Sequence, residues 1–236
     1  MKESIFDKIS SEWWDKNGPM KMLHSMNETR MLFIKERIIN KYQKLGSLKE
    51  ILEKKLILDL GCGGGILSET LAEEGANILA IDQSKKLINE AKKRAKSKKL
   101  KIDYQCQSIE NLKRSRSKFD IILCMEVIEH VKDYRSFFNL SFEFLKKNGI
   151  IIFSTINKSL LSYFTTIFLA EKVLKLVPSK THDWDMYIKP EEILDLAETF
   201  KFKLDKIKGL AAIPSLQGFK WIRINNTKAN YIISII

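Results

Sequence analysis

Residues 56–65 read Leu56-Ile57-Leu58-Asp59-Leu60-Gly61-Cys62-Gly63-Gly64-Gly65, an apolar run that carries one acid and ends in a glycine-rich turn. Such a run predicts a buried strand that opens into a loop, and a helix-like segment at 66–74 follows it. Glycines let the backbone of that loop approach a ligand closely. The next apolar run ends at Asp82, 21 residues after Gly61, an offset at which a carboxylate can accept hydrogen bonds from ribose hydroxyls. The two segments together predict a nucleoside site across the ends of two strands.

Two classes of nucleoside cofactor use this layout. The dinucleotide fingerprint G-x-G-x-x-G/A aims a helix N-terminus at a pyrophosphate, but Ile66 stands where that pattern needs a small residue. The pattern Asp59-x-Gly61-x-Gly63-x-Gly65 resembles motif I of the Rossmann-like methyltransferases that bind S-adenosylmethionine. That cofactor carries a sulfonium, an ammonium and a carboxylate but no phosphate, so an acid such as Asp59 is expected near it. A methyltransferase is therefore the favoured interpretation, and a nucleotide-dependent oxidoreductase is the alternative.

The charge of the chain invites a nucleic-acid partner, and the motifs argue against one. The formal net charge is +12, but nearly all basic residues are lysines spread over predicted helix surfaces, as in residues 85–99. At the end of the fourth predicted strand the chain reads Cys124-Met125-Glu126, where amine-directed nucleic-acid methyltransferases carry a Pro-Pro-aromatic motif. Cytosine-C5 enzymes use a Pro-Cys nucleophile, and none of the four prolines precedes a cysteine. We therefore expect no nucleic-acid partner.

Composition also bears on the compartment. The N-terminus is polar, and the longest apolar stretch, residues 160–170, is far shorter than the ~20 residues that a membrane-spanning helix needs. Cys62, Cys106 and Cys124 lack the spacing of a metal site and indicate a reducing compartment. We expect a cytoplasmic protein without a secretory signal, and peripheral attachment to the inner face of the membrane is left open.

The order of expected elements is that of a parallel α/β sheet. Residues 1–236 are expected to form one domain, with a helical cap over residues 1–50 and an insertion at 156–190. The predicted fold is α/β and Rossmann-like, with a mostly parallel seven-stranded sheet, helices on both faces, N-terminal helices and an insertion after strand five. Strands are expected at 56–60, 78–82, 101–106, 119–124, 150–154, 203–210, 219–224 and 229–235. Helices are expected at about 4–14, from Asn27 as N-cap to Tyr42, and at 66–74, 85–97, 134–146 and 190–200.

Ligands of such sheets lie at the carboxyl ends of the strands. That edge is predicted to bring together Gly61 and Gly63 with Asp82. In the methyltransferase pattern, Ser108 and Ile109 would flank the adenine and Met125 would lie near the cofactor. An ordinary loop or packing role is the alternative for these last three residues.

A second group of chemically active residues follows the fourth strand. If the segment turns helically, Glu126, Glu129 and His130 lie at i, i+3 and i+4 and share one face. These three groups could ligate a hard cation such as Mg²⁺, which would lower the pKa of a bound phenolic oxygen. In the metal-free alternative His130 is the general base, because an unperturbed histidine titrates near ~6.5. His130 and Glu126 are thus the candidate catalytic residues, and a carboxylate that caps the helix beside a hydrogen-bonded histidine is the structural alternative.

Motifs along the whole chain carry a resemblance to one family. They are Glu12-Trp13-Trp14-Asp15, Leu23-His24, Asn27-x-x-Arg30, Leu58 to Leu67, Cys124-Met125-Glu126-x-x-Glu129-His130-Val131, Thr181-His182-Asp183-Trp184, Ile188-Lys189-Pro190, Gly209-Leu210, Trp221 and Asn230-Tyr231. Together they resemble the bacterial ubiquinone-biosynthesis O-methyltransferases, a family of class I S-adenosylmethionine-dependent methyltransferases. The chain departs from the family pattern at residues 211–214, where relatives often carry Tyr and Asn before the proline, and at 146–149, where a Pro-Gly turn is common.

The resemblance implies roles for single residues and for the substrate. Arg30, Gly61, Asp82 and Met125 would contact the cofactor, with the guanidinium of Arg30 on its carboxylate. Glu126, Glu129 and His130 would be the ligands of Mg²⁺. The substrates would be polyprenyl catechols or hydroquinones, namely 2-polyprenyl-6-hydroxyphenol and 3-demethylubiquinol. Other quinones or small phenols remain alternative acceptors, and other ubiquinone-biosynthesis proteins are candidate partners.

The insertion at 156–190 is suited to a lipid substrate. It offers a broad apolar face with lysines around it, as an interfacial helix on an anionic membrane surface would. The apolar residues are Leu160, Leu161, Phe164, Ile167, Phe168, Leu174 and Val177, and the lysines are Lys158, Lys172, Lys175 and Lys180. A lid over the active site, a dimer contact and a non-catalytic membrane scaffold are the alternatives. His182 and Trp184 are candidate residues of the acceptor pocket, with loop packing as their alternative.

Overall fold

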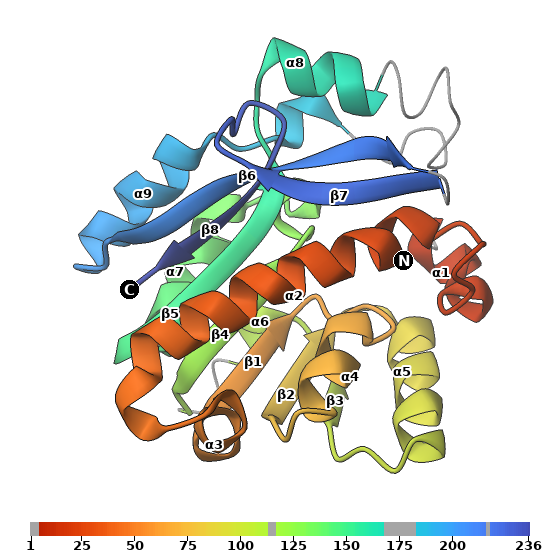
Figure 1. Ribbon diagram of the computed structural model, residues 1–236, viewed down its shortest axis with the longest axis vertical. Helices are drawn as coiled ribbons and strands as arrows, with labels where there is room; N and C mark the ends of the chain where they lie inside the picture. Colours follow the sequence, from red (N-terminus) through yellow and green to blue (C-terminus); the bar gives the residue numbers. More distant parts are fainter. Residues whose placement is uncertain (1–4, 113–116, 168–182, 216–217) are drawn as a thin grey trace.

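The computed structural model describes residues 5–112, 117–167, 183–215 and 218–236, and these form one sheet of eight strands (Figure 1). The strand order is β3-β2-β1-β4-β5-β8-β6-β7. The first five strands are parallel, and β8, β6 and β7 pair antiparallel with their neighbours. The strands are β1 Leu56–Leu60, β2 Asn77–Asp82, β3 Asp103–Cys106, β4 Phe119–Met125, β5 Leu145–Ile156, β6 Leu204–Ser215, β7 Gly218–Ile224 and β8 Asn230–Ile235.

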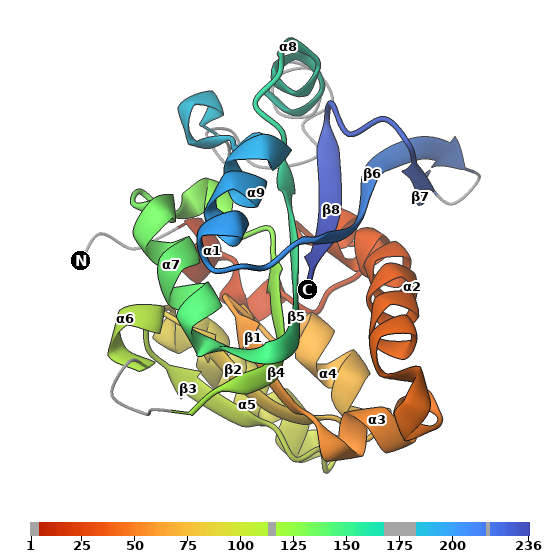
Figure 2. The ribbon, with the colours of Figure 1, turned by 90° about the vertical axis from the view of Figure 1, so that its left-hand side faces the viewer.

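Helices cover both faces of the sheet, as predicted (Figure 2). One face carries α2, α3, α4 and α5, and the other carries α6, α7 and α9. The helices are α1 Ile5–Lys8, α2 Lys21–Tyr42, α3 Leu48–Lys54, α4 Ile66–Ala72, α5 Lys85–Ser97, α6 Ile109–Leu112, α7 Tyr134–Phe144, α8 Leu160–Ser162 and α9 Pro190–Thr199, with short 3-10 turns η1 Ser10–Glu12, η2 Gln43–Leu45, η4 Ile128–His130 and η6 Trp184–Met186. The Rossmann-like α/β prediction is confirmed.

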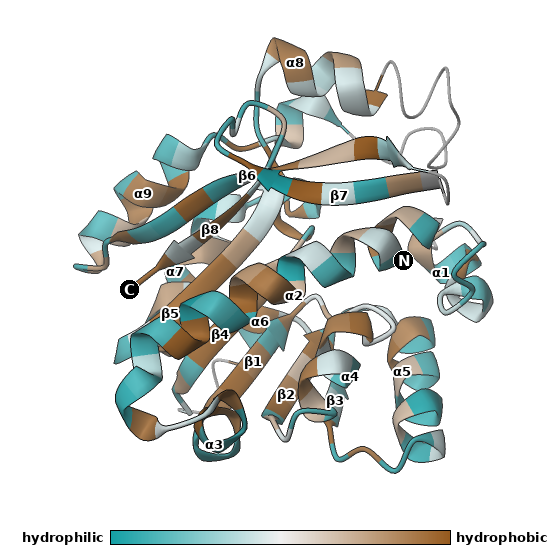
Figure 3. Cartoon of the chain, in the orientation of Figure 1, coloured by the Kyte–Doolittle hydropathy of each residue, from teal (hydrophilic) through white to brown (hydrophobic). Residues whose placement is uncertain are grey.

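The strands at the centre of the sheet are apolar because both of their faces are covered. Ile57 and Leu58 of β1 and Ile121 and Ile122 of β4 are fully buried. The central strands are accordingly hydrophobic in Figure 3, whereas the outward side of α5 is hydrophilic. Many of the lysines that make the net charge positive thus lie on helix faces exposed to solvent.

The sheet has eight strands rather than the seven expected. Each of the eight corresponds to one of the strand ranges expected from the sequence, and the edge strand β7 returns from β6 as an antiparallel hairpin. It is held in place by α2, because Thr29 donates to the carbonyl of Trp221 and the Trp221 indole donates to Ser25. The alternation of apolar and polar residues in 218–224 indicated this strand.

The N-terminal region differs from the prediction. The helix expected at about 4–14 is divided into α1 and η1, because the chain turns at Ile9 and directs Trp13 towards the loop after β1. Helix α2 begins at Lys21, so Asn27 is not its N-cap and instead donates from Nδ2 to Thr70 of α4. Helix α3 was not expected, although Ser47 and Glu50 form a capping box at its start.

The described part of the insertion, residues 156–167, contains α8 and the residues that follow it. Its exposed apolar side chains include Leu160, Leu161 and Phe164, with exposed fractions of 83%, 44% and 52%. The predicted apolar and basic residues at 168–182, His182 among them, lie outside the described residues. Helix α9 starts with Pro190 at its first position, as expected.

Candidate active site

The glycine loop lies between β1 and α4 at the carboxyl edge of the sheet. The amides of Gly61 and Cys62 both donate to the carbonyl of Ile81, at 2.8 and 3.0 Å, which ties the loop to β2. Gly61 and Gly63 have φ angles of +68° and +54°, a conformation that side chains disfavour. The glycines therefore serve a tight turn that opens onto the cavity beside it.

Asp82 ends β2 and closes this loop. Its Oδ2 accepts the amide of Gly63 at 2.9 Å, and its Oδ1 accepts the amide of Ser84 at 2.8 Å. Burial raises the pKa of the Asp82 carboxyl, and the two backbone hydrogen bonds oppose the rise. Because each carboxylate oxygen can accept more than one hydrogen bond, Asp82 can accept further donors, and its contact with ribose hydroxyls stays a prediction.

Asp59 lies behind the glycine loop, with 2% of its surface exposed. Ser68 of α4 donates its hydroxyl to Oδ2 of Asp59, and burial raises the pKa of this carboxyl to about 7. Asp59 thus ties β1 to α4. It also borders the cavity, and its contact with a cofactor stays a prediction.

The residues predicted to surround an adenine line the same cavity. Ser108 and Ile109 follow β3, and Met125 ends β4. Ile109 is 3% exposed, so it also packs in the core. The structure brings these three residues to the edge where Asp82 and the glycine loop lie.

The N-terminal segment packs directly on the glycine loop. The indole of Trp13 lies against Gly63 and Gly64, and the indole of Trp14 donates to the carbonyl of Gly64 at 3.0 Å. The guanidinium of Arg94 in α5 stacks on the ring of Trp14, with its Cζ 3.7 Å from the ring centroid. The sequence singled out this tryptophan pair as a motif but gave no contact for it, because its partners lie about fifty or more residues away.

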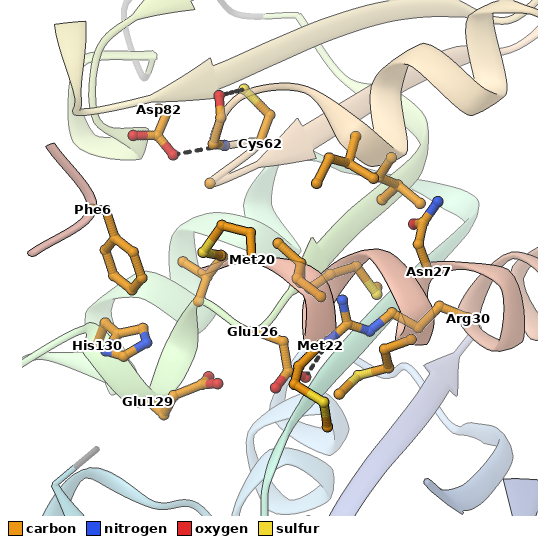
Figure 4. Close-up of a pocket in the computed structure, with 18 of the residues that line it drawn as sticks. Phe6, Met20, Met22, Asn27, Arg30, Cys62, Asp82, Glu126, Glu129 and His130 are labelled. Carbon is orange, nitrogen blue, oxygen red and sulfur yellow. Dashed lines mark hydrogen bonds and ion pairs between the residues drawn. The ribbon is translucent and has the colours of Figure 1, made fainter. Parts of the chain in front are cut away.

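Arg30 projects from α2 to the end of β4. Its side chain is 2% exposed, and its Nη2 lies 2.9 Å from Oε1 of Glu126 (Figure 4). Ser154 of β5 donates to the same carboxylate oxygen at 2.8 Å. Glu126 is therefore held between a helix and a neighbouring strand.

Glu129 and His130 lie in the short turn η4 after β4. Glu129 is buried and accepts the hydroxyl of Thr155 at 2.8 Å. Burial and the neighbouring Glu126 raise the pKa of Glu129, and Thr155 and Arg30 oppose the rise. The exposed His130 packs its ring edge-on against Phe6, with centroids 5.4 Å apart.

The predicted helical face does not form. Glu126 has a φ of +55° and precedes η4, so Glu126, Glu129 and His130 do not follow one another along a single helix. Within the described ranges, no three His, Cys, Asp or Glu side chains are grouped as metal ligands would be. Because Glu126 is paired with Arg30 and Glu129 is buried on Thr155, this arrangement does not fit a divalent cation.

A cavity of about 1370 Å³ joins these groups. Beyond the glycine loop its walls are largely apolar and come from α2, α8, β6 and β7. They include Met22, Met26, Leu161, Thr165, Leu210, Ala211, Ala212, Phe219, Trp221 and Ile224. Trp184 does not line the cavity and instead donates to the carbonyl of Ser159, so for this residue the packing alternative holds.

Comparisons with known proteins agree with this site. Residues 51–225 match the family described as "Methyltransferase domain". Magnesium protoporphyrin IX methyltransferase from Synechocystis PCC 6803 with bound SAH is similar, with a TM-score of 0.67 and 18% identity over 98% of this chain and 93% of that one. An S-adenosylmethionine-dependent methyltransferase from Clostridium acetobutylicum has a TM-score of 0.63 and 18% identity over 98% of both chains. Fold, glycine loop and family match together define a Rossmann-like methyltransferase that depends on S-adenosylmethionine.

Closer relatives narrow this class. Proteins named ubiquinone biosynthesis O-methyltransferase are 45% identical in Pelagibacter ubique, over 98% of this chain and 95% of that protein, and 38% identical in Coxiella burnetii, over 96% and 91%. The chain belongs to the ubiquinone biosynthesis O-methyltransferase family. This confirms the family resemblance and removes the oxidoreductase alternative. None of the helices in the described ranges combines the length and the apolar character that crossing a bilayer requires.

Proposed function

We propose that this protein methylates a ring hydroxyl of polyprenyl catechols or hydroquinones in ubiquinone biosynthesis, with 2-polyprenyl-6-hydroxyphenol and 3-demethylubiquinol as acceptors. The observation that supports this proposal most directly is one continuous cavity. The glycine loop lines its polar half, and apolar side chains line its other half. Its volume of about 1370 Å³ exceeds the ~300–1000 Å³ of common ligand pockets. A cofactor and an acceptor ring can therefore lie side by side.

The residues of the polar half suit S-adenosylmethionine. Among the described residues, Nε and Nη2 of the buried Arg30 lack a well-aligned hydrogen-bond acceptor, and a carboxylate is the natural partner of a guanidinium. In this proposal Arg30 binds the cofactor's carboxylate, Asp82 accepts from its ribose, and Gly61, Gly63 and Met125 border it. When bound, the cofactor supplies an activated methyl group.

The acceptor ring would occupy the apolar half of the cavity. Met22 and Met26 are one helical turn apart on α2 and face the cavity together with Leu210 and Trp221. These walls exclude water and leave the ring few orientations, which favours a near-attack geometry. Leu161 lines the cavity and is 44% exposed, so the apolar half reaches the surface at α8, where a long tail could leave.

In this proposal His130 accepts the proton of the acceptor hydroxyl. His130 borders the cavity from η4, the turn after β4, and lies across the cavity from Cys62 of the glycine loop (Figure 4). General-base catalysis by such a residue contributes about 10²–10⁴-fold. Replacement by glutamine is expected to lower kcat by that amount while leaving the affinity for S-adenosylhomocysteine within about twofold. An unchanged kcat would remove His130 from this role.

The test of the proposed function is a radiolabelled methyl-transfer assay. Purified protein is incubated with S-adenosylmethionine and a catechol that carries a short polyprenyl tail, and the matched control is the same catechol without the tail. We expect methylation of the tailed catechol with a much lower KM, because the apolar half binds the tail. Equal kcat/KM for both catechols would favour a small phenol as the acceptor, and no transfer to either would refute the proposal.

We also propose that α8 contacts an anionic membrane surface, from which the lipid substrate enters. The exposed Leu160, Leu161 and Phe164 support this. Co-sedimentation with vesicles of anionic lipids is expected for the protein and is expected to be lost in the Leu160→Asp/Phe164→Asp variant. Leu45→Asp is the matched control, because Leu45 is 38% exposed and lies in η2. Equal binding by all three proteins would contradict a role for α8.

A further inference from the structure

Arg30 is a buried cation whose hydrogen-bonding capacity the protein meets only in part. Its side chain is 2% exposed, and Nη2 lies 2.9 Å from Oε1 of Glu126. Nε and Nη2 nevertheless have no well-aligned acceptor among the described residues. A buried charge is costly unless it is both paired and hydrogen-bonded. Glu126 supplies the pairing charge, and a second anion in the cavity would complete the hydrogen bonds.

The carboxylate of Glu126 is also held by a residue of the neighbouring strand β5. Ser154 donates its hydroxyl to Oε1 of Glu126, and the Glu126 amide donates to the carbonyl of Ser154 at 2.9 Å. Glu126 also adopts a φ of +55°, in the left-handed region that is uncommon for residues other than glycine. Such a conformation persists where the surrounding structure enforces it, often at a ligand site. The backbone just after β4 thus adopts an unusual conformation at the residue whose carboxylate contacts Arg30 of α2.

This arrangement separates three possible roles of Glu126. A metal ligand would converge with Glu129 and His130, and the described residues show no such group. A catalytic base would need a carboxylate aimed at the acceptor hydroxyl, whereas the contacts of Oε1 with Arg30 and Ser154 tie the Glu126 carboxylate to α2 and β5. Its contacts are those of a group that orients a guanidinium.

We propose that Glu126 is a positioning residue for the cofactor: anchored by Ser154, its carboxylate holds the Arg30 guanidinium in the orientation that binds the carboxylate of S-adenosylmethionine. This rests on the proposed function, in which Arg30 contacts the cofactor. One guanidinium serves both anions, because its five N–H donors form a planar fork. Without Glu126, Arg30 would keep its charge but lose its fixed orientation.

The test is calorimetric binding of S-adenosylhomocysteine to Glu126→Gln, to Arg30→Gln and to the double variant, in metal-free buffer. Glutamine keeps the shape of the side chain and removes its charge. A hydrogen bond to a charged group contributes about 1.5–3 kcal/mol, so Glu126→Gln is expected to weaken binding about tenfold or more. The double variant is expected to bind no more weakly than Arg30→Gln, because Glu126 acts only through Arg30.

Controls separate the possible failures. Asp120→Asn removes an ion-paired carboxylate from the far end of the same strand, where it contacts Lys55 and Lys146, and is expected to leave the affinity unchanged. Ser154→Ala keeps the Arg30–Glu126 charge pair intact and is expected to weaken binding by a smaller factor. Its affinity for S-adenosylhomocysteine tests the proposal if Glu126→Gln folds poorly. Thermal unfolding of every variant identifies loss of folded protein.

Each outcome decides a separate point. Normal affinity in Glu126→Gln beside weak binding in Arg30→Gln overturns the positioning role and leaves the proposed function intact. Normal affinity in Arg30→Gln overturns the cofactor contact of Arg30 and the inference that depends on it. Mn²⁺ binding that is lost in Glu126→Gln, with unchanged affinity for S-adenosylhomocysteine, would show a metal ligand instead. In steady-state assays the inference expects a raised KM for S-adenosylmethionine with kcat nearly unchanged, and the reverse would make Glu126 catalytic.

Discussion

Replacing Gly64 with alanine is expected to force Trp13 away from the glycine loop. A Cβ at Gly64 would lie 2.7 Å from both Cγ and Nε1 of Trp13. Carbon atoms in contact are normally about 3.5–4.0 Å apart, so the overlap is about 1 Å. Trp13 is 6% exposed and packs in a cluster with Ile66 and Leu87, so it cannot turn aside without moving its neighbours.

The loss of stability expected from the clash with Trp13 can be separated from the effect that a Gly→Ala change has on the backbone. Overpacking of this kind costs about 1–3 kcal/mol, against about 5–15 kcal/mol for the whole fold of a typical domain. Gly64, unlike Gly63, does not have a φ in the left-handed region. Where the backbone tolerates it, a Gly→Ala change stabilises a protein by about 0.4–1 kcal/mol. The same substitution should therefore change sign once Trp13 is removed.

The assay is urea unfolding of a double-mutant cycle. Gly64→Ala is expected to destabilise the wild-type protein and to be neutral or stabilising in a Trp13→Leu background. Gly75→Ala is the matched control, since its φ of +91° makes alanine costly in both backgrounds and the atoms nearest to a Cβ there belong to Glu53 and Lys49, not to Trp13. An equal cost of Gly64→Ala with and without Trp13 would refute the reasoning, because the strain would then not come from the indole.

Three further predictions concern single residues. Asp82→Asn is expected to weaken binding of S-adenosylhomocysteine tenfold or more, since hydrogen bonds to charged groups contribute about 1.5–3 kcal/mol; the exposed Asp103→Asn is the control, and equal calorimetric affinities would contradict it. Burial raises the pKa of Asp59 to about 7, so the folded protein favours the protonated carboxyl. Between about pH 4 and 7 the folded state therefore binds more protons at Asp59 than the unfolded state does, and the free energy of unfolding falls as the pH rises, by at most about 1.4 kcal/mol per pH unit. Asp59→Asn should remove that slope in urea unfolding at several pH values, and an unchanged slope would assign it to other groups. Ser47→Ala removes the capping box of α3 and is expected to cost about 0.5–2 kcal/mol in the same assay; its cofactor affinity should not change, and a loss of affinity would tie α3 to the site.

The parts of the fold that could be predicted from the sequence depend on local patterns. The strand Leu56–Leu60 and the helix Lys85–Ser97 were predicted with their observed bounds, because the strand is a nearly continuous apolar run that ends in glycines and the apolar residues of the helix recur with the helical period. The glycine loop and Asp82 could be placed together, since consecutive parallel strands end at one edge. For this reason the residues that line the polar half of the cavity were largely predictable.

The predictions that failed depend on partners distant in the sequence. The spacing of Glu126, Glu129 and His130 suggested a shared helical face, but Glu126 is held outside the helical region by Ser154 and Arg30. The pairing of Arg30 with Glu126 was not predicted, because no local spacing connects two residues that lie 96 positions apart. Periodicity describes an element in isolation, and these contacts join different elements.

Helix α2 shows why the residues at the centre of the site were the hardest to predict from the sequence. Its buried surface includes the polar residues Thr29, Arg30 and Arg37, which interrupt an apolar stripe. Each has a partner on another element: the carbonyl of Trp221 in β7, Glu126 after β4, and Asp205 in β6. The same helix lines the apolar half with Met22 and Met26. One rigid helix therefore forms a wall for both halves of the cavity. A shift of α2 that improves the fit of one ligand must also move the contacts offered to the other ligand. We therefore expect the affinities for cofactor and acceptor to change together.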